Sequence, residues 1–236
     1  MKGKKCYINY SGCGQFKKSQ RRALMIANGF GYTARGYEPE DMDDIFYEFH
    51  SDILGAEKGC GYWAWKPYFI RERLSELHDS DYLIYCDSGV SLVKDPDPLL
   101  KQIDKKGVLV FDMKFKVGEY TKGDTFFYMN KNRDYTHAEE RLCMGGCILI
   151  RKCKESIQFI NKWLYWSFYK DIITDNASTK LSDLDIFQSH RHDQSILSLL
   201  VYQLGIKHIP DHSQYRKFHT DENPDDIYFF LHGDRN

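Results

Sequence analysis

The chain has 236 residues, with 33 Lys and Arg against 34 Asp and Glu and a formal net charge of -1. This balance excludes a general nucleic-acid-binding protein, which would carry a basic excess. The sequence contains no Pro/Gly/Ser-rich linker, low-complexity tract or internal repeat, so we expect a single domain over residues 1–236. Aromatic residues make up 15% of the chain, and most of their rings are expected in the core.

The predicted elements alternate between strands and helices along the chain. Strands are predicted over residues 5–10, 81–86, 107–111 and 144–150, with a final apolar segment over 227–231. Helices are predicted over residues 18–28, 41–49, from Pro67 onward, 95–104, 154–169 and 192–204, whereas the signal over 114–140 is too weak to assign an element. Helices that alternate with buried strands indicate an α/β fold with a mostly parallel central sheet flanked by helices.

The seven cysteines are scattered, and no long apolar export segment follows the short basic start of the chain. We therefore expect a cytoplasmic protein with reduced thiols. Cys143, Cys147 and Cys153 include no CxxC pair with a matching second half, so their spacing does not support a structural zinc site. No apolar run approaches the length that spans a bilayer.

The most informative stretch runs from Gly61 to Gly89 and reads GYWAWKPYFIRERLSELHDSDYLIYCDSG. Pro67 suits the first turn of a helix, where its missing N–H costs nothing. The apolar run of residues 81–86 predicts a strand covered on both faces. Asp87 follows this strand, and ligands of open α/β sheets gather at the carboxyl ends of strands. Asp87 is therefore a candidate functional carboxylate.

Several other residues are candidates for binding phosphate, metal or nucleotide. Asp87 can bind Mg²⁺ or Mn²⁺, which prefer oxygen ligands, and His232 is the best candidate for a second ligand, although a terminal histidine is also a common surface residue. Lys66 can neutralise phosphate. The loop that begins at Tyr10 and Ser11 is not a dinucleotide fingerprint or a P-loop, so it is either a nucleotide contact or a plain turn.

Other residues are candidates for sugar contacts, each with a structural alternative. Asp193 and Gln194 can hydrogen-bond sugar hydroxyls, or Asp193 can simply cap a helix. The pair Gly145 and Gly146 can let a substrate approach the backbone or mark a tight bend. Trp63 and Trp65 can each stack on a ring or fill the core.

Taken in order, these motifs resemble those of nucleotide-sugar glycosyltransferases of the GT-A type. The G-Y-W-x-W-K-P segment followed by a strand ending Y-x-D-x-G is similar to small glycosyltransferases of surface-polysaccharide clusters and viral glycan synthesis. The later Gly-containing strand, Asp-Gln helix and C-terminal His-Gly are similar in order to the glycogenin-like group. The resemblance spans nearly the whole chain and implies a single GT-A-like (Rossmann-like) catalytic domain.

The resemblance also implies roles for individual residues. A Mn²⁺ or Mg²⁺ ion would be held against the donor diphosphate, and UDP is the expected nucleotide. The metal ligands would be Asp87 and His232, the catalytic residues Asp193 and Gln194, and the other donor-binding residues Tyr10, Ser11, Trp63, Lys66, Ser88, Gly145, Gly146 and Arg235. One departure is Gly89, which stands where the usual motif has a second aspartate, so Ser88 or water would complete the metal shell.

The implied reaction transfers a hexose to a saccharide acceptor through an oxocarbenium-like transition state, with a metal and cations stabilising the leaving diphosphate. An inverting enzyme would need a base such as Asp193, but the glycogenin-like order favours retention. The segments 114–140 and 171–191 are the expected walls of the acceptor site.

Two other functions are compatible with parts of this pattern. A sugar-nucleotide nucleotidyltransferase shares the α/β layout and metal-bound phosphates, but its glycine-rich basic signature is missing after Tyr10. A non-catalytic carbohydrate-binding protein is supported only by the aromatic content. Metal-dependent hydrolysis of a sugar nucleotide separates the transferase from the binding protein, and release of pyrophosphate would identify the nucleotidyltransferase.

Overall fold

A six-stranded sheet in the order β2-β1-β3-β6-β5-β7 forms the centre of the computed structural model, which describes residues 3–12, 16–215 and 228–233. Its strands are β1 (Lys5–Tyr10), β2 (Thr33–Tyr37), β3 (Tyr82–Cys86), β5 (Val108–Lys116), β6 (Arg141–Arg151) and β7 (Lys207–Pro210). Strand β6 is antiparallel to its neighbours β3 and β5, and the other strand pairs are parallel. The predicted mostly parallel α/β sheet is confirmed.

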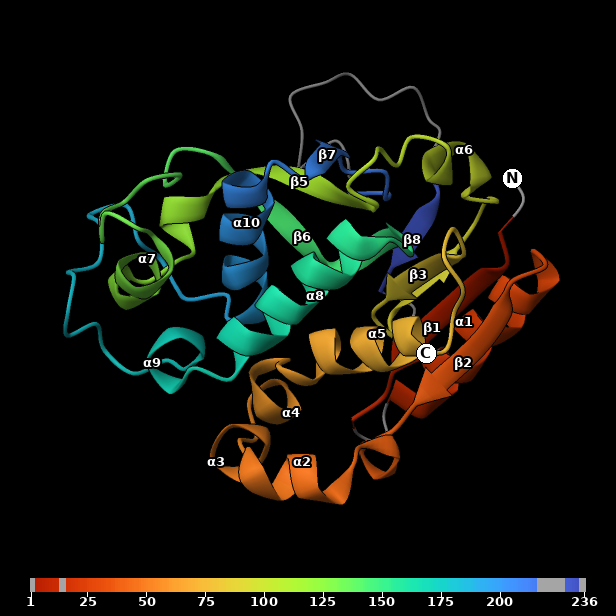
Figure 1. Cartoon of the computed structure of the whole chain (residues 1–236), viewed down its shortest axis with the longest axis horizontal. Coiled ribbons are helices and arrows are strands. Elements are labelled where there is room, and N and C mark those ends of the chain that lie inside the picture. The colour runs from red at the N-terminus through yellow and green to blue at the C-terminus, as the bar shows by residue number, and fades with distance from the viewer. Residues whose placement is uncertain (1–2, 13–15, 216–227, 234–236) are drawn as a thin grey trace.

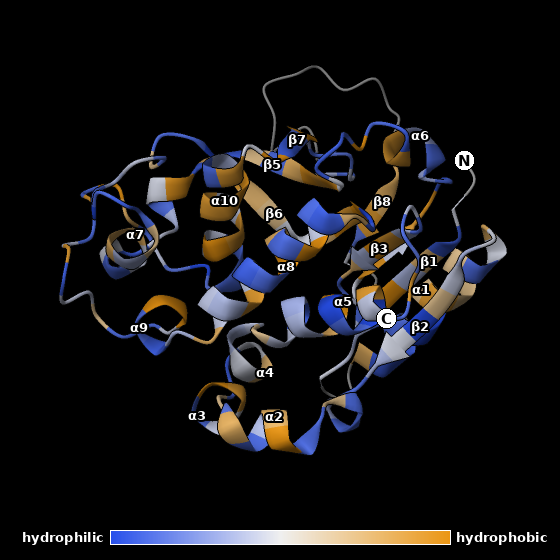
Figure 2. Ribbon diagram, in the orientation of Figure 1, coloured by the Kyte–Doolittle hydropathy of each residue, from blue (hydrophilic) through white to orange (hydrophobic). Residues whose placement is uncertain are grey.

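Helices cover both faces of this sheet (Figure 1). Successive residues of β1 point to opposite faces: Ile8 joins a core with α5 (Trp65–Ser75), α8 (Lys154–Ser167) and α10 (Asp193–Leu204), whereas Tyr7 joins a core with α1 (Lys17–Gly29) and α6 (Asp97–Leu100). In Figure 2 the central strands β5 and β6 and much of α10 are coloured as apolar, whereas the edge strand β2 is mostly hydrophilic. The remaining elements are η2 (Pro39–Asp41), α2 (Asp44–Phe49), α3 (Ser51–Leu54), α4 (Gly59–Tyr62), η3 (Val117–Glu119), α7 (Gly123–Met129) and α9 (Lys170–Ile173).

A second, two-stranded sheet brings the end of the chain beside β3. Strand β4 (Val90–Leu92) directly follows the Asp87 turn and pairs antiparallel with β8 (Phe230–His232). In this register Val90 lies opposite His232. Part of the apolar segment predicted over 227–231 is thus strand β8, while Ile227 lies outside the described residues. The pairing explains how a residue near the C-terminus reaches the carboxyl end of β3.

Some predicted elements differ from the structure. The strand predicted over 144–150 begins at Arg141, so Gly145 and Gly146 lie inside β6 and do not open it. The helix predicted over 95–104 covers only Asp97–Leu100, and the unassigned segment 114–140 contains η3 and α7. Strand β2 was not predicted, because its residues TARGY are partly exposed along an edge and form no apolar run.

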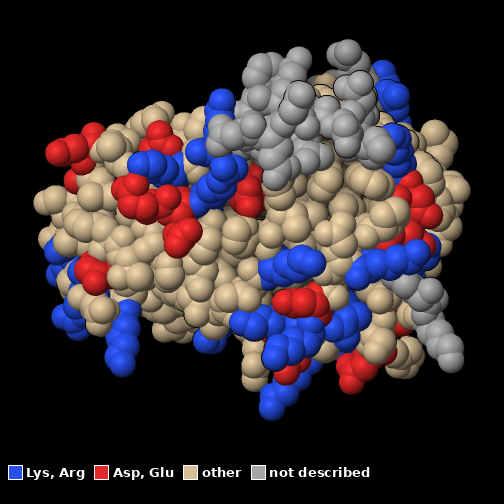
Figure 3. All heavy atoms as spheres, turned by 90° about the horizontal axis from the view of Figure 1, so that it is seen from above, with Lys and Arg blue, Asp and Glu red and all other residues tan. Residues whose placement is uncertain are grey.

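The surface carries charges of both signs. On the face shown in Figure 3, basic and acidic side chains are interspersed around a broad band without charge. Among the described residues, the helices are too short or too polar to cross a bilayer.

Candidate active site at the carboxyl edge of the sheet

Asp87 is held at the end of β3 by its neighbours on two strands. The Tyr85 hydroxyl, two residues earlier, donates a hydrogen bond to Asp87 Oδ1 (2.6 Å), and the Asp87 amide donates to the Gly146 carbonyl of β6 (2.9 Å). Burial and the Asp87 carboxylate raise the pKa of Tyr85 well above its ordinary value, so this phenol stays protonated and remains a donor. The Asp87 side chain is 40% exposed. Asp87 is therefore fixed in place yet accessible to a ligand.

The two glycines of β6 form an irregularity that faces this carboxylate. Val110 of β5 pairs with Ile148, but two residues later Asp112 pairs with Cys143, so residues 144–147 bulge out of the β5–β6 pairing. A Cβ atom on Gly146 would lie 3.1 Å from Asp87 Oδ2 and 3.8 Å from His232 Cε1. The structure thus shows the bend that the glycine pair was predicted to mark, and it also places candidate site residues close to the glycine backbone.

Helix α10 supplies a second carboxylate next to the same bulge. A Cβ atom on Gly145 would lie 3.4 Å from Asp193 Oδ2, and the Gln194 side-chain amide donates to the Cys143 carbonyl of β6 (2.8 Å). Asp193 is only 3% exposed, and burial raises its pKa to about 6 against the attraction of Lys66. At neutral pH Asp193 is thus an ionised carboxylate in a buried place.

Lys66 lies between the two carboxylates. Its Nζ atom is 3.0 Å from Asp193 Oδ2 and 3.3 Å from Asp87 Oδ1, and it donates to the Gly145 carbonyl (3.1 Å). Burial disfavours the Lys66 cation, but the two carboxylates outweigh burial and raise the pKa of Lys66. One buried cation therefore connects α5, β3, β6 and α10.

The turn before Lys66 has an unusual backbone. The five residues Gly59, Cys60, Gly61, Tyr62 and Trp63 all have positive φ, between 50° and 98°. Each non-glycine residue in this left-handed conformation costs about 1–2 kcal/mol. A Cβ atom on Gly59 would lie 2.5 Å from the Trp63 indole, and one on Gly61 would lie 2.8 Å from the Leu54 backbone. The two glycines thus permit a tight turn that fixes the start of α5.

This turn places its two tryptophans in different surroundings. Trp65 donates from its indole N–H to the Gly59 carbonyl (3.0 Å) and stacks on Tyr10 at a centroid distance of 3.9 Å. Trp63 lies against Gly59 and against the ring of His192, 5.6 Å away. Trp63 is therefore packed beside the residue that precedes Asp193, and it is Trp65 that lies at the end of β1.

A cavity of about 270 Å³ opens beside this aromatic pair. Its lining is mostly apolar and comes from β1, η2, α2, α3 and the turn before α5: Tyr10, Pro39, Met42, Tyr47, Leu54, Gly55, Ala56, Glu57, Cys60 and Trp65. Ser11, the next residue after β1, is fully buried and its amide donates to the Tyr37 carbonyl (2.9 Å). The cavity lies at the end of β1, and the stacked rings of Tyr10 and Trp65 form part of its wall. Such an apolar, aromatic lining suits a planar ring.

Asp87 and His232 are the candidates for a partial set of metal ligands. Both side chains approach the position that a Cβ atom on Gly146 would occupy. Asp87 Oδ2 faces this position, while Asp87 Oδ1 accepts the hydrogen bond from Tyr85. Gly233 donates from its amide to the Gly89 carbonyl (3.1 Å), which ties the two segments together. In the described part of the chain, no cluster of three or more His, Cys, Asp or Glu could hold a metal by itself. One carboxylate and one imidazole nevertheless fit a cation that takes its other ligands from phosphate and water.

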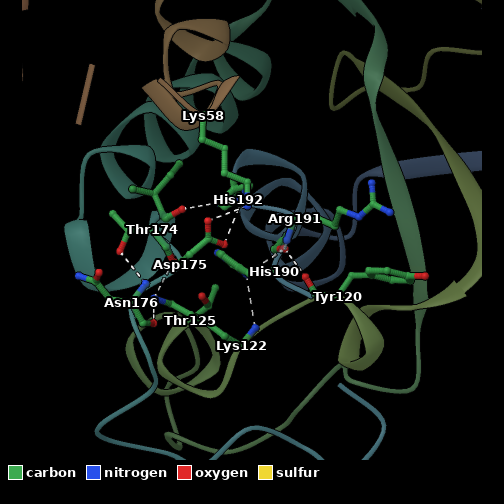
Figure 4. A network of polar contacts seen from close by, with 12 residues as sticks. Lys58, Tyr120, Lys122, Thr125, Thr174, Asp175, Asn176, His190, Arg191 and His192 are labelled. Carbon is green, nitrogen blue, oxygen red and sulfur yellow. Dashed lines mark hydrogen bonds and ion pairs between the residues drawn. The ribbon is translucent and has the colours of Figure 1, made fainter. Parts of the chain in front are cut away.

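A second polar network builds a wall next to Asp193 (Figure 4). The buried Lys122 ammonium donates to the Thr174 and Asn176 carbonyls (2.8 and 3.1 Å), and His192 Nδ1 donates to the Ile173 carbonyl (2.7 Å). Lys58, from the segment before α4, forms an ion pair of 2.6 Å with Asp175. The two segments predicted to border the acceptor, 114–140 and 171–191, are thus bound to each other.

The structure brings together most of the predicted site residues. Those at the bulge are Lys66, Asp87, Gly145, Gly146, Asp193, Gln194 and His232. Ser88 is buried in the turn after Asp87, Tyr10 lines the cavity, and Trp63 lies against His192. Arg235 lies outside the described residues.

Sequence reasoning missed the contribution of Tyr85 and left the surroundings of Trp65 open. Tyr85 stands two positions before Asp87, so strand alternation could have placed both side chains on the same face. Trp65 directly precedes Lys66, but the sequence gives no sign that its ring would stack on Tyr10.

The comparisons with known proteins agree on the fold. No protein-family model and no curated protein matches the sequence. The chain is similar to the apo structure of mouse xyloside xylosyltransferase 1, with a TM-score of 0.52 and 8% identity over 98% of this chain and 97% of that one. It is also similar to galactosyltransferase LgtC in complex with donor and acceptor sugar analogues, with a TM-score of 0.51 and 12% identity over 96% of this chain and 86% of LgtC. The fold is that of GT-A-type glycosyltransferases.

A third similar structure is the bifunctional glycosyltransferase WbbM, with a TM-score of 0.52 and 11% identity over 98% of this chain but only 46% of WbbM. The resemblance inferred from the motifs is therefore confirmed at the level of the fold. The identities of 8–12% carry no information about donor, acceptor or metal.

Proposed function

We propose that the chain is a glycosyltransferase that moves a sugar from a nucleoside-diphosphate sugar to a saccharide acceptor, with a UDP-sugar as the donor and a single catalytic domain. One observation carries the proposal. On a GT-A fold, four side chains from distant parts of the sequence, Lys66, Asp87, Asp193 and His232, converge around the β6 bulge at the carboxyl edge of the sheet. This is the edge at which α/β proteins bind their ligands.

The geometry supports one orientation for the donor. The nucleobase would occupy the apolar cavity beside Tyr10 and Trp65, and the diphosphate would extend toward Asp87. Asp87 Oδ2 and His232 would hold a Mn²⁺ or Mg²⁺ ion, with phosphate oxygens and water as its other ligands. When bound, such a cation neutralises the negative charge that develops on the leaving diphosphate.

Asp193 is best suited to an electrostatic role toward the donor sugar. Its carboxylate is ionised at neutral pH but faces Lys66 and the bulge at Gly145, and it is almost closed to solvent. A fixed negative charge there stabilises the positive charge that grows on the sugar, whereas a base for the acceptor hydroxyl must be accessible to the acceptor. This supports transfer with retention, which proton NMR of the product's anomeric configuration tests.

The acceptor would lie against the wall formed by segments 114–140 and 171–191. This wall adjoins Asp193 through His192, and its ion pair between Lys58 and Asp175 is half exposed. Exposed charges and the nearby Tyr62 and Trp63 rings are the groups that bind saccharide hydroxyls and sugar faces.

A thermal-shift screen tests the proposed function. UDP, GDP, CMP and ADP are each added with and without Mn²⁺ to the wild type and to Asp87→Ala. A ligand at 100 times its Kd stabilises the native state by about 2.7 kcal/mol, which is roughly 5–11 °C for a protein of this size. We expect such a shift for UDP with Mn²⁺ in the wild type and none in Asp87→Ala.

The outcome of the screen also separates the alternatives. The proposal fails if no nucleoside diphosphate stabilises the wild type under either condition. Release of pyrophosphate from a nucleoside triphosphate and a sugar phosphate would instead identify a nucleotidyltransferase. Slow hydrolysis of the UDP-sugar in the absence of acceptor would support the transferase.

A further inference from the structure

The Lys66 ammonium is enclosed by groups of the protein itself. Its Nζ atom donates a hydrogen bond to Gly145 O (3.1 Å) and forms ion pairs with Asp193 Oδ2 (3.0 Å) and Asp87 Oδ1 (3.3 Å). The side chain is only 4% exposed. The rings of Trp65 and Tyr85 flank the ammonium, with centroids 5.8 and 5.6 Å from it. A phosphate oxygen could bind Lys66 only by displacing a carboxylate from a buried cation.

The three acceptors come from three different elements that meet at the site. Asp87 follows β3, Gly145 lies in the β6 bulge, and Asp193 opens α10. Because both carboxylate oxygens lie within 3.3 Å of the same nitrogen, they are at most about 6 Å apart. Two carboxylates at this distance repel each other when no cation lies between them.

We propose that Lys66 is a positioning residue, whose ammonium fixes the carboxylate of Asp87, which would face the diphosphate, relative to the carboxylate of Asp193, which would face the sugar. This rests on the proposed function, and it replaces the sequence-based expectation that Lys66 neutralises phosphate directly. Loss of the ammonium leaves Asp87 with its Tyr85 hydrogen bond but frees Asp193 and the bulge to move. Donor binding then persists while transfer is impaired.

The test separates nucleotide affinity from the rate of transfer. Lys66→Met keeps the length of the side chain without its charge, and UDP binding with Mn²⁺ is measured by calorimetry next to kcat and KM for the UDP-sugar. We expect the Kd for UDP and the KM to change less than threefold and kcat to fall at least 100-fold. Lys5→Met is the matched control, because Lys5 is also ion-paired (Asp97, 2.7 Å) but lies at the amino end of β1. It should leave kcat within twofold of the wild type.

A second pair of variants keeps the test decisive if Lys66→Met does not fold. Asp193→Asn and Asp193→Asn/Lys66→Met differ only in Lys66, and neither leaves the Asp193 charge buried without a partner. If Lys66 positions the carboxylates, these two variants bind UDP with the same affinity within threefold. A loss of tenfold or more on removing Lys66, in either background, shows a direct phosphate contact and overturns the proposal.

If the wild type binds no nucleoside diphosphate, the proposed function itself is refuted, and with it the role of Lys66. Wild-type binding of UDP with an unchanged kcat in a folded Lys66→Met variant overturns only the positioning role.

Discussion

Replacement of Asp193 by Asn is expected to stabilise the protein at neutral pH while removing its activity. Asp193 is 3% exposed and forms its ion pair with Lys66, yet burial raises its pKa from 3.8 to about 6. The attraction of Lys66 is already included in that value. Relative to the unfolded chain, the folded protein therefore disfavours the ionised carboxylate, and a neutral isostere avoids this cost.

The magnitude follows from the displaced pKa. A pKa of 3.8 for Asp193 in the unfolded chain and of about 6 in the folded protein corresponds to a free-energy difference of about 3 kcal/mol between the two states. Between these values Asp193 binds more protons in the folded state than in the unfolded state, so its contribution to wild-type stability falls as the pH rises from about 4 to 6 and then stays low. An Asn side chain does not titrate. The Asp193→Asn variant should thus be up to about 3 kcal/mol more stable at pH 7.5, or roughly 6–12 °C in Tm for this chain length.

Thermal melts in chelator at pH 4.0, 5.0, 6.0 and 7.5 measure this difference. The gap between Asp193→Asn and the wild type should be largest at pH 7.5 and close near pH 4, where the wild-type acid is protonated. Asp87→Asn is the matched control, since Asp87 is the other carboxylate paired with Lys66 but its side chain is 40% exposed. A variant that is less stable than the wild type at pH 7.5, or a gap that does not shrink on acidification, would refute the reasoning.

Three further substitutions test the cation site through Mn²⁺ titrations of activity and of thermal stability in UDP. Gly146→Ala places a methyl group 3.1 Å from Asp87 Oδ2 and 3.8 Å from His232 Cε1, so apparent Mn²⁺ affinity should fall while the melting temperature without ligand changes little; an unchanged titration would place the cation elsewhere. His232→Ala should weaken Mn²⁺ activation by roughly 10- to 100-fold, and an unaltered metal response would remove His232 from the site. Gly89→Asp has open space for its side chain and should tighten Mn²⁺ binding several-fold; weaker binding would argue against this position beside the cation.

The parts of the fold that could be predicted are those in which local sequence and burial agree. Strand β1 is predicted within its observed bounds, and β3 within one residue, because both are short apolar runs bounded by polar residues. Helix α10 has buried residues around most of its circumference and begins at Asp193, one residue after the predicted start. The carboxyl-edge rule then places Asp87 at the site without any knowledge of its neighbours.

The parts that were missed depend on contacts between distant residues or on backbone geometry. Strand β4 is three residues long and exists through its pairing with β8, about 140 residues later. The run of positive φ from Gly59 to Trp63 contains two glycines that permit it, but Cys60 and Tyr62 give no local sign of a left-handed conformation. Such a turn is stable only because the surrounding core fixes it.

Lys66 shows how the neighbours of a charged residue lead to a proposed role that differs from the one its sequence position indicates. A lysine beside a phosphate-binding segment is ordinarily taken as a phosphate ligand, since the sequence shows its charge but not its neighbours. Asp193 lies 127 residues further along the chain, and only the packing of α10 against β6 brings its carboxylate to Lys66 Nζ. Once two carboxylates and a carbonyl surround a buried ammonium, the cost of exchanging one of them for another anion is large. We therefore propose that the Lys66 charge, which the sequence assigns to the substrate, holds the two carboxylates together in the folded protein.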